Sequence, residues 1–422
     1  MKTAVRADAL WRPYTQHALA DEPLAVSGAS GSTLVLEDGR RLFDAVSSWW
    51  VTLHGHAHPK IAAAVAEQAG RLEQALFADF THEPARRLAE GLLEIAPAGL
   101  SRVFLSDDGS TAVEAALKMA VGHWAARGER RTMIAALEGA YHGDTFGAMS
   151  ASARGTFTAP YASMLFDVLR LPLPVDDAAA RECRRLLEPQ AGRLAALIVE
   201  PLVLGAAGMR MYPPRALAEL RRVCSELGIL FIADEVMTGF GRTGTMFACQ
   251  AADVSPDILC CSKGITGGFL PLGATLATEE VFSSFLSEDR ARTFFHGHSY
   301  TGNPIACAAA VASLEVFKTE PVLERIARIG AAHERHLARF AERPEVAQVR
   351  RRGTIAAIEL AASDAGYLSG LGPRLRRFYI ERGVYLRPLG NVVYMIPPYC
   401  STEEELAHAY RVIEESLALL AR

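Results

Sequence analysis

Two apolar segments of the sequence each end in a residue that could do chemistry. Residues 230–233 run directly into Asp234, and residues 258–261 lead to Lys263 after one serine. Both segments have the length and apolar character of buried strands. The carboxyl ends of such strands would bring a carboxylate and an amine to one edge of a sheet. Pyridoxal phosphate needs this pair: a lysine to hold its aldehyde as a Schiff base, and a carboxylate to keep its pyridine nitrogen protonated.

Each of these two residues also has an ordinary interpretation when taken alone. A lysine after a strand is usually solvated, and an aspartate is usually a helix cap or an ion-pair partner. Their joint placement favours the cofactor, and the small residues Gly264, Gly267 and Gly268 leave room for a ring beside Lys263. Burial would also weaken the preference of the lysine for its charged form, which favours imine chemistry.

A turn suited to a phosphate group follows another predicted strand. Residues 108–111 stand between the strand at 102–105 and a predicted helix over 112–126. The N–H groups and positive dipole end of a helix start attract anions, Gly109 would let the backbone approach closely, and Ser110 could donate its hydroxyl. Ordinary N-capping, with Glu114 nearby, is an alternative. No strand leads into GxGxxG, which weakens the case for a dinucleotide.

An aromatic residue stands in a comparable place after the strand predicted at 131–136. Tyr141 opens the sequence Tyr-His-Gly-Asp and could lie against a pyridine ring. Simple packing of the tyrosine at a strand end is an equally good interpretation without further context.

The elements that must position these residues alternate along the middle of the chain. Alanine-, leucine- and arginine-rich helical stretches separate short apolar runs, which predicts an α/β fold with a mostly parallel central sheet covered on both faces. The strands predicted for this sheet are 102–105, 131–136, 195–199, 230–233 and 258–261.

The two ends of the chain look different from its middle. The first fifty residues contain a turn at 37–40 between short extended pieces, which predicts a β-hairpin outside the main sheet. After a connecting helix over 303–317, strands at 353–360 and 391–396 with two amphipathic helices predict a smaller α+β domain. We therefore expect an N-terminal segment of the small domain over 1–55, a large cofactor-binding domain over 56–315 and the C-terminal small domain over 316–422.

The composition is that of an enzyme-sized globular protein. The chain has 422 residues, a net charge of -4 and a pI near 6.3, so no basic excess favours nucleic acid or an anionic membrane. No apolar run approaches the roughly 20 residues of a membrane span, and the first residues do not form a signal peptide. We expect a cytoplasmic protein whose seven cysteines are reduced.

Clustered histidines raise a hypothesis of a different class, a histidine-rich metalloenzyme. Histidines alternate at 54, 56 and 58 and again at 296 and 298. Alternate residues on a strand share a face and could bind zinc. However, Gly55 and Pro59 would break a strand, and no carboxylate or cysteine completes a known spacing, so we expect no metal and a loop that leads into a helix after Pro59.

Taken together, the motifs resemble those of class III, fold type I aminotransferases over essentially the whole chain. The resemblance implies a pyridoxal-phosphate fold of type I and an aminotransferase activity. Retention of both Asp234 and Lys263 also argues against a non-catalytic binding protein. The segments that carry the resemblance are 141–145, 234–244, 261–268 and 296–304.

The same resemblance implies roles for individual residues. Lys263 is the Schiff-base lysine, Asp234 the partner of the pyridinium, and Tyr141 the residue that covers the ring, while Gly109 and Ser110 hold the phosphate. The segment Gly297-His298-Ser299 reaches the cofactor phosphate of a second subunit, which implies a homodimer with shared active sites. Many relatives have Pro-Thr where this chain has His298-Ser299, and Ser299 keeps the hydroxyl.

Three peripheral segments, 11–16, 47–50 and 386–391, resemble those of family members that act in biotin biosynthesis. These members use S-adenosyl-L-methionine as amino donor and 8-amino-7-oxononanoate as acceptor. The resemblance makes Tyr14 catalytic and places Trp49, Tyr141, Gly297 and Arg387 at the substrate. An enzyme that uses an ω-amino acid with pyruvate, or lysine as donor, is the alternative within the family.

Overall fold

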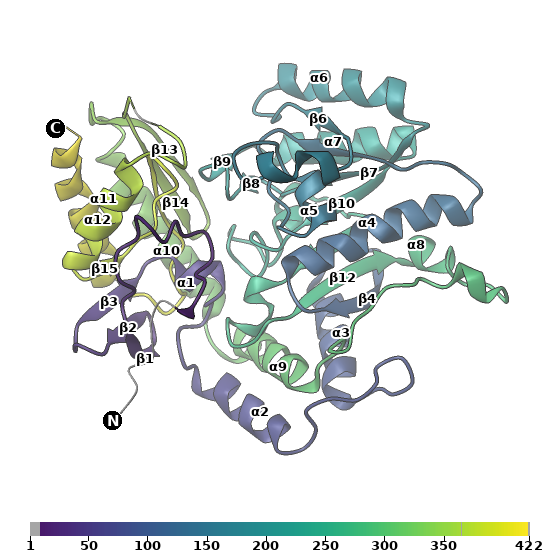
Figure 1. Ribbon diagram of the computed structural model, residues 1–422, viewed down its shortest axis with the longest axis horizontal. Helices are drawn as coiled ribbons and strands as arrows, with labels where there is room; N and C mark the ends of the chain where they lie inside the picture. The colour runs from purple at the N-terminus through teal and green to yellow at the C-terminus, as the bar shows by residue number, and fades with distance from the viewer. Residues whose placement is uncertain (1–8, 364, 421–422) are drawn as a thin grey trace.

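The chain forms two lobes with a cleft between them (Figure 1). The computed structural model describes residues 9–363 and 365–420. The larger lobe is built around a seven-stranded sheet, and the smaller lobe contains both ends of the described chain.

The central sheet of the large lobe contains the five strands predicted from the sequence. All neighbouring strands are parallel except those that pair with β12, which runs antiparallel to β11 and β4. In spatial order the strands are β4 (Leu100–Ser106), β12 (Gly273–Thr278), β11 (Ile258–Cys261), β10 (Leu230–Asp234), β7 (Leu194–Val199), β5 (Met133–Leu137) and β6 (Val168–Leu171).

Helices cover both faces of this sheet, which explains why its strands are continuous apolar runs. Every residue of β7, β10 and β11 is buried. Alternate residues of β10 pack on opposite sides: Ile232 clusters with side chains of α4 (Gly109–Ala126), and Phe231 with Leu217 of α7 (Pro214–Leu227). The shorter elements of this lobe are α5 (Phe146–Ala151), α6 (Asp177–Leu187), α8 (Glu279–Ser283), β8 (Val203–Leu204) and β9 (Arg210–Met211).

Two helices pack against a third that leads from the large lobe into the small one. The connecting helix α9 (Pro304–Thr319) is capped by Asn303, whose side chain accepts the N–H of Ala306 at 2.9 Å. It packs against α2 (Pro59–Ala69) and α3 (Glu83–Ile95). The helix predicted over 303–317 and the helix start at Pro59 are thus both confirmed.

The small lobe joins segments from both ends of the chain. The N-terminal strands β1 (Val26–Ser30), β2 (Thr33–Leu36) and β3 (Arg41–Asp44) form an antiparallel meander, and β15 (Val384–Tyr385) pairs with β3 in parallel. The other small-lobe elements are β13 (Val346–Arg352), β14 (Ile355–Leu360), β16 (Val392–Met395), α10 (Val322–Ala338), α11 (Leu371–Glu381) and α12 (Glu403–Ser416).

The small lobe is therefore α+β, as predicted, with the N-terminal hairpin outside the main sheet. Strands β13 and β15 and a third helix were not predicted. The sequence of β13 is rich in arginine and none of its residues is buried, so it lacks the apolar pattern of a core strand. The division at residues 55 and 315 stays a prediction.

Two further findings concern the membrane and the thiols. Within 9–363 and 365–420, none of the helices combines the length and the hydropathy required to cross a bilayer. The seven cysteines are free thiols, and all except Cys400 are buried.

Candidate active site

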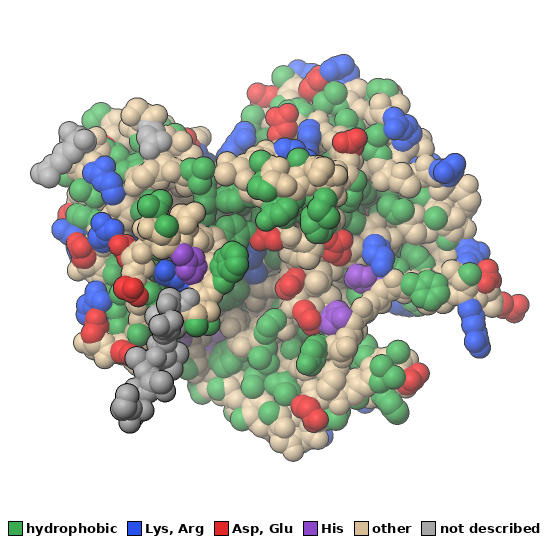
Figure 2. All heavy atoms as spheres, in the orientation of Figure 1, with side chains coloured by type: hydrophobic (Ala, Val, Ile, Leu, Met, Phe, Trp, Pro, Cys, Tyr) green, Lys and Arg blue, Asp and Glu red, His purple; other side chains and the backbone are tan. Residues whose placement is uncertain are grey.

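A pocket of about 430 Å³ opens at the carboxyl ends of the central strands. Five of the residues predicted to bind a cofactor line it together: Gly109, Ser110, Tyr141, Asp234 and Lys263. Figure 2 shows the cleft above it, with hydrophobic side chains along the rim and acidic side chains on the wall of the large lobe. The sheet brings these residues together because each follows the end of a strand.

The start of α4 forms one wall of the pocket. The carboxylate of Asp108 accepts the N–H of Thr111 at 2.8 Å, and the Thr111 hydroxyl accepts the N–H of Asp108 at 3.0 Å. A Cβ at Gly109 would lie 2.6 Å from Cγ1 of Val236, so only glycine lets α4 approach the segment that follows Asp234. The helix start, with Gly109 and Ser110 in its first turn, faces the pocket and is suited to an anion.

Glu114 does not take part in the N-terminal cap of α4, which was the alternative interpretation of this turn. The N-terminal cap of α4 consists of Asp108 and Thr111. The carboxylate of Glu114 instead accepts the N–H groups of Gly147 and Ala148, at 2.7 and 3.1 Å. It thereby ties α4 to the start of α5, directly after the loop that carries Tyr141.

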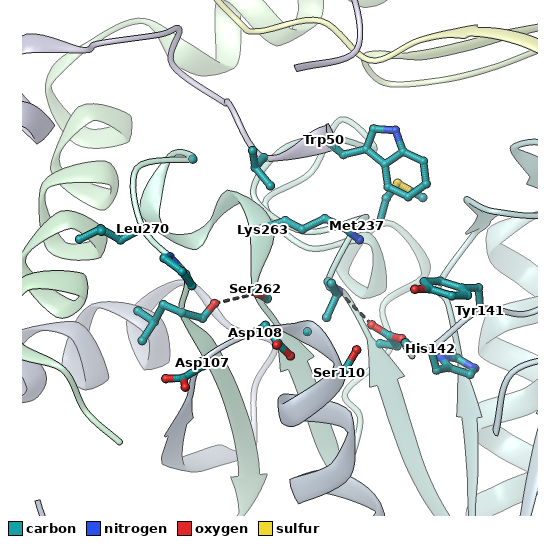
Figure 3. Close-up of a pocket in the computed structure, with 18 of the residues that line it drawn as sticks. Trp50, Asp107, Asp108, Ser110, Tyr141, His142, Met237, Ser262, Lys263 and Leu270 are labelled. Atoms are coloured by element: carbon teal, nitrogen blue, oxygen red, sulfur yellow. Dashed lines mark hydrogen bonds and ion pairs between the residues drawn. The ribbon is translucent and has the colours of Figure 1, made fainter. Parts of the chain in front are cut away.

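Lys263 extends into the pocket from the turn that follows β11. Its Nζ lies 4.9 Å from the centre of the Trp50 ring, and Figure 3 shows the side chain running across the pocket beneath that indole. Burial lowers the pKa of the Lys263 amine, although the negative charges of Asp234 and Glu200 oppose this shift. A larger fraction of neutral amine makes Lys263 a better nucleophile and proton acceptor.

Asp234 ends β10 and is held by two partners. Its Oδ2 lies 2.6 Å from Nδ1 of His142, and its Oδ1 accepts the N–H of Val236 at 3.1 Å. Both the aspartate and the histidine are buried. The carboxylate is therefore fixed in orientation and shielded from water, as a partner for a ring nitrogen must be.

Tyr141 lines the pocket beside His142 (Figure 3) and is held by Glu200, which follows β7. The two Glu200 carboxylate oxygens accept the N–H groups of Tyr141 and Gly205, at 2.9 and 3.0 Å. Burial raises the pKa of Glu200 to about 7. A Cβ at Gly143 would lie 2.2 Å from the Ser110 hydroxyl oxygen, so this glycine lets the tyrosine loop press against the start of α4.

A second, adjoining chamber of about 640 Å³ is shared between the lobes. Tyr14, Trp49, Tyr141, Lys263 and Arg387 all line it. The Tyr14 hydroxyl lies 3.3 Å from that of Tyr141 and donates to Asp144; burial raises the pKa of Tyr14 to about 12, so the hydroxyl stays protonated.

Arg387 also lines this chamber. The Cζ atom of its guanidinium is 5.2 Å from the centre of the Trp49 ring. The chamber thus combines aromatic rings with the Arg387 guanidinium, which suits a carboxylate; Lys263 and Arg154 also line it.

The segment Gly297-His298-Ser299 does not line either pocket of the described chain. All three residues are exposed. His298 Nδ1 lies 3.4 Å from a carboxylate oxygen of Asp107, and the Ser299 carbonyl accepts a hydrogen bond from Gln74 at 3.0 Å. The cofactor contact predicted for this segment is to a second subunit, which a single chain does not test.

Trp50, His142 and Glu200 are among the pocket residues that had no predicted role in the site. Glu200 stands directly after a predicted strand, in the same place as Asp234, and this position was the available signal. His142 is part of the motif that supplied Tyr141. Nothing in the sequence indicated that Trp50, rather than its neighbour Trp49, faces the lysine.

The clustered histidines at 54–58 have separate partners. His54 Nε2 lies 3.2 Å from the Ser313 hydroxyl, and His58 Nε2 lies 3.2 Å from a carboxylate oxygen of Glu320. His56 pairs with Asp44. In the part of the chain that the structure describes, no group of three or more histidine, cysteine, aspartate or glutamate residues could hold a metal ion.

A lysine two residues after a buried strand, an anchored carboxylate and a helix start suited to phosphate are the features expected at the catalytic centre of a pyridoxal-phosphate enzyme. The family model for class-III aminotransferases matches residues 15–417, and the chain belongs to this family of pyridoxal-phosphate-dependent transaminases. The fold type I architecture predicted from the sequence is confirmed.

Individual relatives are similar over nearly their whole length. The chain is 49% identical to the adenosylmethionine-8-amino-7-oxononanoate aminotransferase of Synechococcus elongatus, covering 97% of this chain and 98% of the relative. The solved structure of the enzyme of that name from Methanocaldococcus jannaschii has a TM-score of 0.93 and 36% identity, with 97% of each chain covered. An amine transaminase from an uncultivated Pseudomonas species, in its PLP-bound form, has a TM-score of 0.91 and 34% identity, covering 97% of this chain and 98% of that one.

The residues of the first pocket fit pyridoxal phosphate. The pocket is large enough for a pyridine ring with its phosphate, and it offers an amine, a buried carboxylate, an aromatic side chain and a helix start in one enclosure. The close approaches at Gly109 and Gly143 would be lost with any larger residue. The pocket therefore offers a chemically suitable group for the aldehyde, the ring nitrogen, the ring face and the phosphate of the cofactor.

Proposed function

We propose that this protein transfers the amino group of S-adenosyl-L-methionine to 8-amino-7-oxononanoate and produces 7,8-diaminononanoate in biotin biosynthesis. The observation that carries the proposal is the 49% identity, over nearly the full length of both chains, to an enzyme named for these two compounds. Enzymes of the same name from Nitratidesulfovibrio vulgaris and Geobacter sulfurreducens are 44% and 39% identical.

Four groups of this chain are assigned to the cofactor in this proposal. Gly109 and Ser110 would hold the phosphate at the start of α4, Tyr141 would cover the ring, and Asp234 would pair with the ring nitrogen. Pyridoxal phosphate supplies an aldehyde that accepts the amino group of the donor and a protonated ring that withdraws electrons from the substrate carbon. The buried Asp234 favours that protonated ring because its negative charge stabilises the added proton.

Lys263 moves the proton in each half of the reaction. Lys263 lines both chambers. The lowered pKa of the amine allows it to accept a proton from a substrate carbon and to return that proton later. The Trp50 ring over the amine keeps water away from this transfer.

The second chamber binds the two substrates in turn. The rings of Trp49, Tyr14 and Tyr141 suit the apolar chain of the oxononanoate, and Arg387 suits its carboxylate. Because one chamber serves both substrates, the donor product must leave before the acceptor enters. This sequence is a ping-pong mechanism with pyridoxamine phosphate as the form between the two halves.

Donor and acceptor can be tested separately. Adding S-adenosyl-L-methionine alone should convert the visible absorbance of the bound pyridoxal phosphate to that of pyridoxamine phosphate, and 8-amino-7-oxononanoate should then restore it with formation of 7,8-diaminononanoate, detected by mass spectrometry. Double-reciprocal plots should be parallel. Intersecting plots would contradict the shared chamber, and turnover of an ω-amino acid with pyruvate, but not of these substrates, would contradict the assignment.

A second candidate function is that of an omega transaminase, which would use lysine or an ω-amino acid as the amino donor. Solved structures named omega transaminase, from Pseudomonas jessenii, share the fold with TM-scores of 0.92 to 0.93 at 26–27% identity. A panel with lysine and ω-amino acids as donors, each at equal concentration, separates this candidate from the adenosylmethionine reaction.

We also propose that the working unit is a homodimer, and we retain the cytoplasmic location. Exposed large side chains support the dimer: Leu76, Phe80, Phe295 and Tyr300 are 63%, 63%, 71% and 63% exposed, and the last two flank the Gly297-His298-Ser299 segment. Sedimentation analysis should give twice the mass of one chain. A monomer with full activity would overturn the shared-site proposal.

A further inference from the structure

The segment that carries Trp49 and Trp50 has an unusual backbone. It forms α1 (Ser47–Trp50), in which Ser47, Ser48 and Trp50 have φ values of 51°, 60° and 69°. Residues with a side chain rarely adopt this region. Ser48 is the most distorted, with φ 60° and ψ -70°, the geometry of a tight γ-turn. A backbone of this kind persists only where neighbouring groups hold it in place.

The strained turn lets two consecutive rings face the same chamber. Trp49 lies edge-on to Tyr14, with ring centres 5.5 Å apart, while Trp50 covers Lys263 and donates from its Nε1 to the Tyr394 hydroxyl at 3.1 Å. Both tryptophans line the second chamber. In an extended strand two consecutive side chains would point to opposite faces.

Asp44, at the end of β3, holds this turn. Its side chain is fully buried, and three donors converge on its Oδ2: the Ser48 N–H at 2.6 Å, the Ser48 hydroxyl at 2.9 Å and His56 Nε2 at 2.9 Å. The His56 backbone is itself anchored, because its N–H and carbonyl both pair with Gly31. The Asp44 carboxylate is thus fixed by His56 and in turn accepts two hydrogen bonds from Ser48, the most distorted residue.

We propose that Asp44 is a positioning residue for substrate binding, which holds the strained Ser48 turn so that Trp49 and Trp50 both face the chamber. Asp44 lines neither pocket and acts only through the turn. The inference rests on the proposed function for the choice of substrates, but the geometry of the turn does not depend on their identity.

The first test compares Asp44→Ala with Asp44→Asn. Asp44→Ala should raise the KM of both substrates roughly tenfold while kcat changes less, because the rings that contact substrate are displaced. Asp44→Asn keeps an oxygen for the Ser48 N–H and should lose less. Asp38→Asn is the matched control, because Asp38 lies on an exposed turn of the same sheet and pairs with Arg40. The wild-type rate with the same substrates tests the proposed function separately.

A second variant tests whether Asp44 acts by holding the Ser48 turn or only by stabilising the small lobe. Glycine adopts φ 60° without a side-chain clash, so Asp44→Ala/Ser48→Gly should recover part of the activity that Asp44→Ala loses. A carboxylate that only stabilised the lobe would give no such recovery. If Asp44→Ala does not fold, Asp44→Asn and Asp44→Asn/Ser48→Gly are compared in the same way, with the same expected order.

A readout without cofactor or substrate completes the test. In a Trp11→Phe background, which removes a tryptophan that is 93% exposed, acrylamide should quench the fluorescence of cofactor-free Asp44→Ala more strongly than that of the parent, because Trp50 is only 6% exposed in the native turn. Unchanged quenching together with unchanged KM values would overturn the proposal, as would a double variant no better than Asp44→Ala.

Discussion

His142 Nδ1 lies 2.6 Å from Oδ2 of Asp234, and the two side chains are 0% and 4% exposed. The pair joins the end of β10 to the loop after β5, so the histidine fixes the carboxylate from a separate part of the chain. Hydrogen bonds to charged groups are worth about 1.5–3 kcal/mol, which is enough to matter for catalysis.

Replacing this histidine should slow the reaction. In His142→Phe the ring is kept but the donor is lost, so we expect kcat to fall roughly tenfold to a hundredfold because Asp234 is less well held. Steady-state kinetics with both substrates measure this loss. His17→Phe, at an exposed histidine, is the control, and an unchanged kcat in His142→Phe would contradict a role for the pair.

The close approach at Gly109 predicts weaker cofactor binding when a methyl group is added. Gly109→Ala should push α4 away from Val236 and raise the Kd of pyridoxal phosphate on the order of tenfold, since overpacking typically costs about 1–3 kcal/mol. Titration of the cofactor-free protein gives the Kd. Gly109→Ala/Val236→Ala should recover affinity, whereas Gly192→Ala, at an open position, should have no effect.

The raised pKa of Glu200 predicts that the stability of the fold depends on pH. Burial raises its pKa from 4.5 to about 7, so the folded protein binds a proton more tightly than the unfolded chain does. Protonated Glu200 therefore contributes up to about 3 kcal/mol to the free energy of unfolding below pH 4.5, and this contribution is lost as the pH rises towards 7. Between pH 5 and 8, urea unfolding of cofactor-free Glu200→Gln should therefore lose less stability than the wild type. Equal losses would refute this prediction, and Glu404→Gln, on the surface, is the control.

Arg387 should govern the affinity for the acceptor. Arg387→Ala should raise the KM for 8-amino-7-oxononanoate roughly tenfold to a hundredfold, because a charged hydrogen bond to the carboxylate is lost. Arg387→Lys keeps the charge but not the planar fork of donors, so it should recover only part of the affinity. An unchanged KM would remove Arg387 from the acceptor site; Arg181→Lys, at an exposed arginine, controls for surface charge.

Much of the large lobe could be predicted from the sequence, and the reason is physical. Strands buried on both faces leave continuous apolar runs, and the residues that follow them must meet at one edge of the sheet. This reasoning brought Asp234, Lys263, Gly109 and Tyr141 into one pocket. Strands β6 and β12 were not predicted, and the antiparallel direction of β12 leaves no mark in its sequence.

The contacts within the site depended on features that sequence patterns do not contain. The partnership of His142 with Asp234 joins two loops that only the fold brings together. Trp50, which faces Lys263, follows a turn in which Ser48 has a φ of 60°, a backbone region that usually indicates glycine. The substrate assignment came from resemblance, because aromatic rings and one arginine suit many acidic substrates.

The pairing of β3 with β15 places a constraint on how the protein is made. Phe43 leaves the ribosome 341 residues before its partner in the sheet, Val384. The edge of β3 therefore stays unpaired while the whole large lobe is synthesised, and an unpaired edge can capture other chains. Truncation before β15, or a pause in translation there, should thus cause aggregation through the exposed edge of β3.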